Sequence, residues 1–368
     1  MKQIKIAMLG ASLEQNGGIA TVEKLIIKHV SSDIEIEHIT SHDEGSIIHR
    51  IKVFTKSFSL LAWRLLTQKT DIIHLHISDG GSILRKALLA LMAFTFRKPV
   101  LIHTHGAEFH ITYAKLPKWI QQIFSFLFSH CGAFIVLSKA WKDYYVENLG
   151  LDEQQVVILP NPTELPYEVP VRSNREKVKI GFFGRVGERK GTFDLIKAFA
   201  NLPPALKNSA ELIIAGDGDL EKARVLVSHL GLTNHVNFLG WIDSQKRDEL
   251  LAYVDIFALP SYNEGFPMAL LEAMGWALPA IVTPIGGIPE LITQKKNGLL
   301  VNPGDIQQLS DAIECLIEDE TLRISLGVAA RQTVAPFDIK TYCARLDDIY
   351  SSIIEIKPGS KLYPGIAG

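Results

Sequence analysis

Two glutamates stand alone as charged residues in a mostly apolar stretch of the sequence. Residues 261–284 read SYNEGFPMALLEAMGWALPAIVTP, and their only charges are Glu264 and Glu272. A surface helix would carry complementary charges three or four residues apart beside an apolar stripe, and this stretch lacks that pattern. Pro267 suits the first turn of a helix that reaches about Trp276, so we expect Glu264 on the preceding loop and Glu272 inside the helix.

This arrangement suits a ligand that carries both an anion and a sugar. The backbone N–H groups of residues 265–268 would point outward at the helix start, where they form a site for negative charge. Glu272 would be costly to bury without hydrogen-bond donors, and two vicinal sugar hydroxyls would supply them. The alternative interpretation is a surface helix with a stray glutamate.

A basic loop offers the cations that such a ligand needs. The segment GRVGERKG, residues 184–191, follows an apolar run and contains Arg185 and Lys190. It is neither a Walker A loop, which needs GK before Ser or Thr, nor a GxGxxG loop. Both side chains suit a diphosphate and would stabilise charge on a departing one. Taken alone, the segment has a second interpretation as an ordinary solvated loop.

Twelve short apolar runs provide the elements that must position these residues. Each is followed by a turn signal and a helix-length segment, which is typical of parallel strands joined by crossover helices. The runs cover residues 4–9, 34–39, 72–77, 100–105, 133–137 and 156–159 in the first half, and 179–183, 211–215, 236–239, 256–259, 280–282 and 298–301 in the second. The predicted fold is α/β, with two doubly wound parallel sheets.

A proline-rich stretch over residues 160–178 separates the two halves. At 368 residues the chain is too long for one ordinary domain. We expect an N-terminal Rossmann-like, acceptor-binding domain over residues 1–165 and a C-terminal Rossmann-like, nucleotide-sugar-binding domain over 166–337. A helix over 338–356 is expected to pack back on the first domain, and a loose tail covers 357–368.

Residues with chemical potential follow the predicted strands. Ligands of open parallel sheets bind outside the carboxyl ends of the strands, where loops and helix starts converge. The residues at such ends are Gly17, Gly18, His103, His105, Gly184, Arg185, Gly216 and Glu264. Two such sheet edges facing each other would enclose an interdomain cleft.

Together these segments resemble the retaining glycosyltransferases of family 4, which have the GT-B fold of two facing Rossmann-like domains. The resemblance covers about residues 1–356. Its segments are GGIA (17–20), HTHG (103–106), LPNP (159–162), GRVGERKG (184–191), AGDG (215–218), EGFPMALLE (264–272), TPIGGIPELI (283–292), NGLLVNPGD (297–305) and FDIKTY (337–342). One departure is GWALP, residues 275–279, where the family usually has a small residue, any residue and then glycine.

The resemblance implies a donor site for a nucleotide-diphosphate sugar. Arg185 and Lys190 would hold the diphosphate, Glu272 would bind the ribose hydroxyls, and Glu264 would face the donor sugar. The implied donor-binding residues are Gly17, Gly18, Gly184, Arg185, Lys190, Gly216, Gly265, Phe266, Pro267 and Glu272. The implied catalytic residues are His105, Arg185, Lys190 and Glu264, with His105 near the transferred sugar.

The implied reaction retains the anomeric configuration, and the leaving phosphate oxygen takes the proton of the acceptor, so no protein nucleophile, metal or cofactor is required. We expect a hexosyltransferase that uses a UDP-sugar, or alternatively a GDP-sugar, and a lipid-linked or polysaccharide acceptor. A nucleotide-sugar epimerase or glycosyl phosphorylase on the same fold, and a non-catalytic two-lobed sugar-binding protein, stay open as alternatives.

Histidines concentrate early in the chain, since ten of the twelve precede residue 131. His74 and His76, like His103 and His105, are two residues apart and would share a strand face, so a four-histidine metal site is conceivable. No carboxylate or cysteine stands at ligand spacing. We therefore expect core or cleft histidines and no metal.

Positive charge is concentrated in residues 46–142, which hold thirteen Lys or Arg and three acids, although the whole chain has a net charge of −2. Residues 50–69 and 115–128 mix cations with Trp, Phe and Leu, as interfacial helices do. We expect peripheral contact with an anionic membrane. The alternative is that the apolar side chains face the core and the cations are solvated. Nucleic acid is not expected, because no binding motif accompanies the charge.

The stretch over residues 119–138 carries no formal charge and has the length of a membrane span. Polar residues in its middle, and a Cys-Gly pair that divides it, favour a helix followed by a buried strand instead. The apolar stretch at the N-terminus is too short for a signal peptide, and the three cysteines form no CxxC pair. We expect a cytoplasmic protein, peripheral at the inner face of the membrane.

Overall fold

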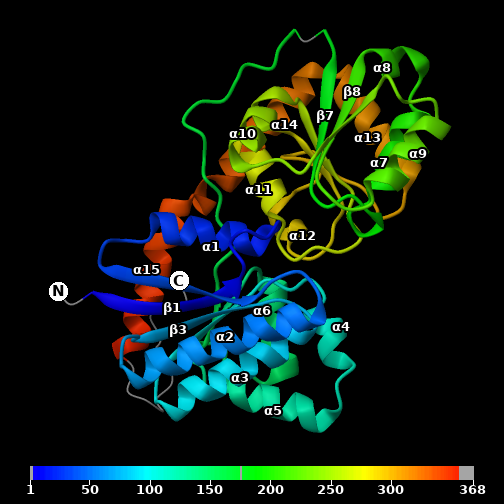
Figure 1. The fold of residues 1–368 in the computed structure, drawn as a ribbon. Helices are drawn as coiled ribbons and strands as arrows, with labels where there is room; N and C mark the ends of the chain where they lie inside the picture. The colour runs from blue at the N-terminus through cyan, green and yellow to red at the C-terminus, as the bar shows by residue number, and fades with distance from the viewer. Residues whose placement is uncertain (1–2, 175, 356–368) are drawn as a thin grey trace. The chain divides into compact units, whose positions relative to one another are not determined.

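The computed structural model describes residues 3–174 and 176–355, which form two compact α/β units (Figure 1). Among the described residues, unit 1 comprises 3–162 and 339–355, and unit 2 comprises 163–338 without residue 175. Each unit has one six-stranded sheet, and the named strands pair in parallel. The tail predicted over residues 357–368 lies outside the described residues.

The sheet of unit 1 has the strand order β2-β1-β3-β4-β5-β6. Its strands are β1 (Ile4–Ala11), β2 (Ile34–His42), β3 (Ile72–Ile77), β4 (Val100–Thr104), β5 (Ala133–Val136) and β6 (Val156–Ile158). Its helices are α1 (Gly18–His29), α2 (Ile47–Leu66), α3 (Gly81–Thr95), α4 (Phe109–Ala114), α5 (Lys118–Ser129), α6 (Lys139–Leu149) and α15 (Ile339–Glu355). Figure 1 shows α1 and α15 on one face of this sheet and α2, α3 and α5 on the other.

The sheet of unit 2 has the strand order β12-β11-β10-β7-β8-β9. Its strands are β7 (Val178–Phe183), β8 (Ala210–Ala215), β9 (Val236–Gly240), β10 (Ile256–Leu259), β11 (Ala280–Val282) and β12 (Leu299–Leu300). Its helices are α7 (Thr192–Asn201), α8 (Pro204–Asn208), α9 (Leu220–His229), α10 (Ser244–Tyr253), α11 (Met268–Gly275), α12 (Ile288–Leu291), α13 (Ile306–Glu318) and α14 (Glu320–Val334), with 3-10 turns η1 (Glu188–Lys190) and η2 (Ala335–Phe337).

All twelve predicted strands are present, and the α/β prediction is confirmed. Parallel strands with helices on both faces are buried throughout, so they read as continuous apolar runs. Every residue of β3, β5 and β10 is buried. The uncharged stretch over residues 119–138 divides as predicted, with α5 ending at Ser129 and β5 beginning at Ala133. Within the part of the chain that the structure describes, no helix combines the length and apolarity needed to cross a bilayer.

The strand orders fix where loops can gather. In unit 2 the chain continues from β7 to its neighbour β8 on one side and from β10 to its neighbour β11 on the other side. In unit 1 it continues from β1 to β2 on one side and from β3 to β4 on the other. Loops that leave two such strands diverge to opposite faces of the sheet and leave a crevice at its carboxyl edge. The crevice of unit 2 lies between the loops after β7 and β10, and that of unit 1 between the loops after β1 and β3.

Candidate functional site

The crevice of unit 2 brings together a lysine and a glutamate that the sequence predicts. Lys190 Nζ lies 2.5 Å from Glu264 Oε1, and Ser261 Oγ donates a hydrogen bond to the same oxygen at 2.8 Å. The Glu264 side chain is 6% exposed and that of Lys190 17%. A buried carboxylate needs such donors, so the contact fixes both side chains where β7 and β10 end.

Glycines allow the neighbouring loops to approach the loop after β10. Gly191 has φ +68°, and a Cβ there would lie 2.0 Å from the carbonyl oxygen of Pro260. Gly286 has φ +54°, and a Cβ there would lie 1.9 Å from the carbonyl oxygen of Glu264. Only glycine combines a left-handed backbone with this close an approach. The TPIGGIP segment therefore supports the backbone of Glu264, a role that its spacing in the sequence did not reveal.

A cavity of about 430 Å³ lies beside the loop after β7. Arg185 lines it with its side chain half exposed, and Arg185 Nε lies 3.3 Å from Asp217 Oδ1. The lining residues are Arg185, Val186, Gly187, Glu188, Arg189, Lys190, Asp217, Gly218 and Asp219. The two predicted cations thus share one cavity, and each already faces a carboxylate.

The predicted glycines of this region bring the loops after β7 and β8 together. A Cβ on Gly216 would lie 1.8 Å from the carbonyl oxygen of Gly184, so the two loops contact each other through backbone alone. The Arg185–Asp217 contact adjoins this crossing. These glycines therefore position the cation and its partner, and they bring no side chain of their own to the cavity.

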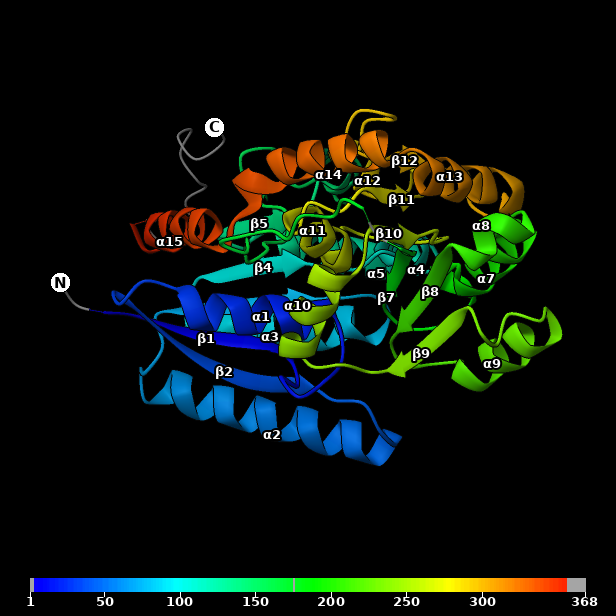
Figure 2. The same cartoon turned by 90° about the horizontal axis from the view of Figure 1, so that it is seen from above.

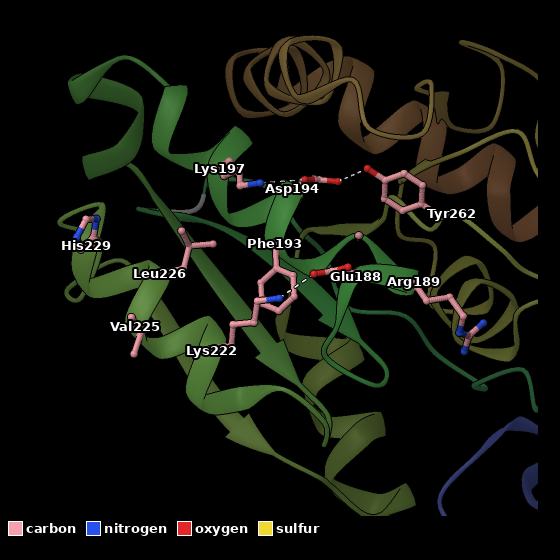
Figure 3. A pocket seen from close by; sticks show the side chains of 11 residues that line it. Glu188, Arg189, Phe193, Asp194, Lys197, Lys222, Val225, Leu226, His229 and Tyr262 are labelled. Carbon is pink, nitrogen blue, oxygen red and sulfur yellow. Dashed lines mark hydrogen bonds and ion pairs between the residues drawn. The ribbon is translucent and has the colours of Figure 1, made fainter.

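A larger cavity of about 830 Å³ opens between η1, α7 and α9 (Figure 3). Its polar side chains pair with one another: Lys222 Nζ lies 2.7 Å from Glu188 Oε1, and Tyr262 donates to Asp194 at 2.7 Å. Among the described residues that line it, none is a predicted site residue. The predicted cations therefore do not line the larger cavity. Arg185 and Lys190 line the smaller one beside it. Its lining residues are Glu188, Arg189, Gly191, Phe193, Asp194, Lys197, Lys222, Val225, Leu226, His229 and Tyr262.

Glu272 lies inside α11, and its side chain is 11% exposed, so the interpretation as a stray surface glutamate is wrong. Its Oε1 lies 3.1 Å from Arg247 Nη1 on α10. Burial raises the pKa of Glu272 to about 7, although the nearby Arg247 lowers it. The structure thus supplies a cationic partner that the sequence analysis missed, because Arg247 lies twenty-five positions earlier on another helix. The predicted place of Pro267 in the first turn of the helix is wrong as well, because Pro267 is the N-cap of α11 and the first turn begins at Met268.

Gly265 and Phe266 complete the loop before α11, and both are buried. The Phe266 ring packs against Phe337 at a centroid distance of 5.9 Å. This contact fixes the ring inside unit 2. The backbone role expected for Gly265 and Phe266 stays a prediction.

Two predicted residues of unit 1, Gly17 and Gly18, lie at the crevice between β1 and β3. Gly17 is the N-cap of α1 and Gly18 its first residue, and both line a cavity of about 250 Å³. The other lining residues are Gly10, Ala11, Gln15, Asn16, Ile19, Ala20, His42, His76, Ser78, Ser82, Arg85 and Lys86. Burial lowers the pKa of Lys86 to about 7, and its ammonium donates to the carbonyl oxygen of Leu9.

His105 follows β4 and is held by two neighbours. Its Nε2 lies 2.9 Å from Nδ1 of His76 on β3, and its side chain is hydrogen-bonded to Asn161 of the LPNP segment. Burial lowers the pKa of His105 to about 3, against the effect of Asn161, so the imidazole is neutral at neutral pH. LPNP is one of the segments that carry the family resemblance, but nothing in its sequence shows that its asparagine contacts the histidine.

Two family models match the chain. The one described as Glycosyltransferase Family 4 matches residues 33–165, and the one described as Glycosyl transferases group 1 matches residues 167–333. Among curated relatives, the N-acetyl-alpha-D-glucosaminyl L-malate synthase of Bacillus anthracis is 31% identical over 309 residues, which cover 80% of this chain and 78% of the relative. The UDP-Gal:alpha-D-GlcNAc-diphosphoundecaprenol alpha-1,3-galactosyltransferase of Escherichia coli is 27% identical over 319 residues, which cover 81% and 80%.

The fold is similar to that of solved structures. The crystal structure of Anabaena Alr3699/HepE in complex with UDP-glucose matches with a TM-score of 0.75 at 21% identity, over 95% of this chain and 100% of that chain. At this level of identity the likeness shows the fold, two Rossmann-like units with parallel sheets.

Proposed function

Because this chain belongs to the GT-B glycosyltransferases of the family 4 type, we propose that it transfers a hexose from a UDP-sugar to a lipid-linked or polysaccharide acceptor, with retention of the anomeric configuration. The observation that carries the proposal is the part-buried Lys190–Glu264 pair, whose lysine lines the same cavity as Arg185. A cofactor has no part in the proposal, and the nucleotide-sugar is a co-substrate.

In this proposal, Arg185 and Lys190 bind the diphosphate of the donor. A guanidinium forms paired hydrogen bonds to phosphate oxygens, and both cations stabilise the charge that develops when the diphosphate leaves. The diphosphate would replace Asp217 as the partner of Arg185 and Glu264 as the partner of Lys190. Release from Lys190 would free the Glu264 carboxylate to accept hydrogen bonds from the hydroxyls of the donor sugar.

Glu272 is the proposed acceptor for the two ribose hydroxyls. Its burial in α11 excludes water from those hydrogen bonds, and Arg247 favours the ionised carboxylate that accepts them. The preference for uridine diphosphate is supported by the UDP-glucose in the Anabaena structure and by the UDP-Gal in the name of the Escherichia coli relative. That name also includes a diphosphoundecaprenol acceptor, which supports a lipid-linked substrate.

The proposed chemistry is direct. The bond between the anomeric carbon and the leaving phosphate oxygen breaks, and the acceptor oxygen bonds to the same face of that carbon. The acceptor proton passes to the leaving phosphate oxygen, whose charge Arg185 and Lys190 stabilise. For unit 1 we retain the roles implied by the resemblance, in which the backbone of Gly18 binds phosphate and His105 contacts the transferred sugar.

The test is transfer by the purified protein. UDP- and GDP-sugars are incubated with a synthetic undecaprenyl-diphosphate glycan, and release of nucleoside diphosphate is followed together with the anomeric configuration of the product by NMR. We expect transfer from a UDP-sugar with retention. An epimerised donor, a sugar phosphate formed from added phosphate, or donor binding without turnover would each replace the proposal with one of its alternatives.

We also propose that unit 1 contacts an anionic membrane at the cytoplasmic face. α2 lies along the edge strand β2 (Figure 2) and exposes Ile47, Ile51 and Trp63 together with several cations, while Leu61 and Leu65 face the core. α5 exposes a second apolar set beside Lys115 and Lys118, formed by Trp119, Ile123 and Phe126. Apolar and cationic side chains on one exposed surface suit an anionic bilayer. Sedimentation with anionic vesicles, but not with neutral ones, is the expected result, and equal recovery in both supernatants would refute this contact.

A further inference from the structure

Three histidines lie together in the interior of unit 1 with unused ring nitrogens. His74, His76 and His103 are at most 2% exposed, and each offers one ligand nitrogen within 4.8 Å of the other two. Among the described residues, no hydrogen-bond partner is found for Nε2 of His74, for Nε2 of His76 or for either nitrogen of His103. Buried polar atoms without a partner are rare in native proteins, and a bound metal ion is one way in which such nitrogens are satisfied.

The sheet of unit 1 creates this cluster. His74 and His76 lie two residues apart on β3, so they share a face, and the parallel register pairs His76 with His103 on β4. The ring centroids of His74 and His76 are 4.3 Å apart, and those of His76 and His103 are 4.8 Å apart. The three ligand nitrogens come from two adjacent strands, and rotation of the rings about their side-chain torsions would bring the nitrogens closer together.

Neighbouring side chains orient two of the three rings. Tyr350 Oη of α15 lies 2.7 Å from His74 Nδ1. His76 Nδ1 lies 2.9 Å from His105 Nε2 and 3.6 Å from Glu23 Oε1 of α1. A metal-binding histidine ordinarily donates its second ring N–H to an oxygen or carboxylate, which leaves the lone pair of the first nitrogen for the metal. In both rings the engaged atom is Nδ1 and the unused atom is Nε2.

We propose that His74, His76 and His103 bind one Zn²⁺ ion, with water in the fourth position. Three neutral imidazoles suit Zn²⁺ better than the oxygen-preferring Mg²⁺ or Ca²⁺. Nitrogens about 2.0 Å from a tetrahedral ion lie about 3.3 Å apart, so a spread of up to 4.8 Å must contract by about 1.5 Å. His76 also lines the cavity of about 250 Å³, which gives the ion a path to the cluster.

No metal was expected from the sequence, because no carboxylate stands at ligand spacing. In the fold, α1 brings the Glu23 carboxylate beside the His76 ring. The proposed ion joins β3 and β4 and, through Tyr350, the closing helix α15. Its role is to stabilise unit 1. It takes no part in the proposed transfer, so either proposal can fail without the other.

The test uses tag-free, full-length protein that has been stripped with a chelator and titrated with Zn²⁺ against a competing indicator. We expect one equivalent to bind, and His103→Gln to weaken the affinity by at least about 100-fold, since it removes one of three ligands. His130→Gln is the matched control, because this exposed histidine lies outside the cluster. Saturating Zn²⁺ should raise the melting temperature of the wild type and of His130→Gln, but not of His103→Gln.

Two measurements decide the matter if His103→Gln does not fold. Co²⁺ bound to the wild type should show the intense visible absorption of a tetrahedral nitrogen-ligated ion. Tyr350→Phe, which keeps all three ligands, should weaken Zn²⁺ binding by about 10-fold, because the His74 ring loses its hydrogen bond to the Tyr350 hydroxyl. Less than stoichiometric Zn²⁺ in the wild type, equal binding by His103→Gln, or the weak spectrum of octahedral Co²⁺ would overturn the proposal.

Discussion

The two units have similar sheets but place opposite kinds of polar residue at the strand ends. In unit 2 the predicted ionisable side chains face partners of opposite charge, as in the pairs Lys190–Glu264 and Arg247–Glu272. In unit 1 histidines stack on one another along β3 and β4, and burial lowers the pKa of His74 to about 3. A paired cation stays ionised and can exchange its partner for an anionic ligand, whereas a neutral imidazole keeps a lone pair. The paired cations of unit 2 therefore fit the charged ligand proposed above, and the neutral histidines of unit 1 fit the hydroxyl and the metal ion proposed for that unit.

Replacing Lys190 with Met tests the charged half of this comparison and should have the largest effect. The variant removes a cation that would stabilise the leaving diphosphate, so we expect the transfer rate to fall by about 100-fold or more. It also leaves the buried Glu264 carboxylate without its cation, which should lower the free energy of unfolding. Initial rates at saturating donor and chemical denaturation measure the two effects.

A second substitution separates catalysis from stability at this pair. Lys190→Met combined with Glu264→Gln removes the unpaired charge, so we expect it to recover stability but not activity. Lys197→Met is the matched control, because Lys197 pairs with Asp194 at 3.5 Å and lines the larger cavity. Wild-type rates in Lys190→Met would show that the ion pair is structural and that Lys190 does not stabilise the charge of the leaving diphosphate.

Gly286→Ala tests whether backbone contacts hold the charged residues of unit 2 in place. A Cβ there would overlap the carbonyl oxygen of Glu264 and displace the loop. A misplacement of about 1 Å can cost about 100-fold in rate, and we expect the loop to relax by a smaller shift, with a loss of about 10- to 30-fold together with lower stability. Gly231→Ala is the matched control, because it has a similar φ of +68° and nothing within 4 Å of its added Cβ. If the two variants lose rate equally, the contact with Glu264 has no functional role.

The sequence predicted the positions of the site residues along the strands better than it predicted their partners. Continuous apolar runs identify parallel strands buried on both faces, and the strand ends then place Lys190 and Glu264 at one edge. Arg247 and Glu23 escaped prediction, because each reaches its partner from a different helix. Helix periodicity does not show such contacts, since they depend on how separate elements pack.

The same limit applies to α2. Its mixture of cations and aromatic residues predicted an interfacial helix, but only the structure shows that Leu61 and Leu65 face the core while Ile47 and Trp63 are exposed. One apolar stripe satisfies the core, and the remaining apolar side chains need a separate explanation. Sequence composition did not separate the two sets.

Glu272→Gln tests the buried carboxylate. It should lower the affinity for UDP by about 10-fold at pH 8, because it removes a charged hydrogen-bond acceptor. The folded-state pKa of Glu272, about 7, lies above its ordinary value of 4.5. The folded state therefore binds this proton more tightly, and ionisation lowers stability as the pH rises from 4.5 to 7. Glu272→Gln should accordingly gain about 1 to 3 kcal/mol over the wild type at pH 8 and almost nothing at pH 4, where the carboxyl group is mostly protonated in both states.

Calorimetric titration with UDP at pH 6, 7 and 8 separates the carboxylate from the phosphates of the ligand. The phosphates titrate equally with both proteins, so the ratio of wild-type to variant affinity isolates Glu272. We expect this ratio to rise with pH as the carboxylate ionises. A constant ratio would mean that Glu272 does not bind the ribose in its charged form.

Trp119→Ser tests the exposed surface of unit 1 and should have the smallest effect. The indole is 63% exposed on α5, and its insertion into a bilayer would contribute about 1 kcal/mol, so we expect about 5-fold weaker binding to anionic vesicles. Val328→Ser is the matched control, since Val328 is a 51% exposed apolar residue on α14 of unit 2. Transfer to a water-soluble acceptor should be unchanged in both variants, because neither side chain lines the cavities that the proposed chemistry uses. Equal vesicle binding by the two variants would mean that the apolar surface of α5 is not the membrane contact. The two units would then differ only in the polar residues of their sheets, which are ion pairs in unit 2 and neutral histidines in unit 1.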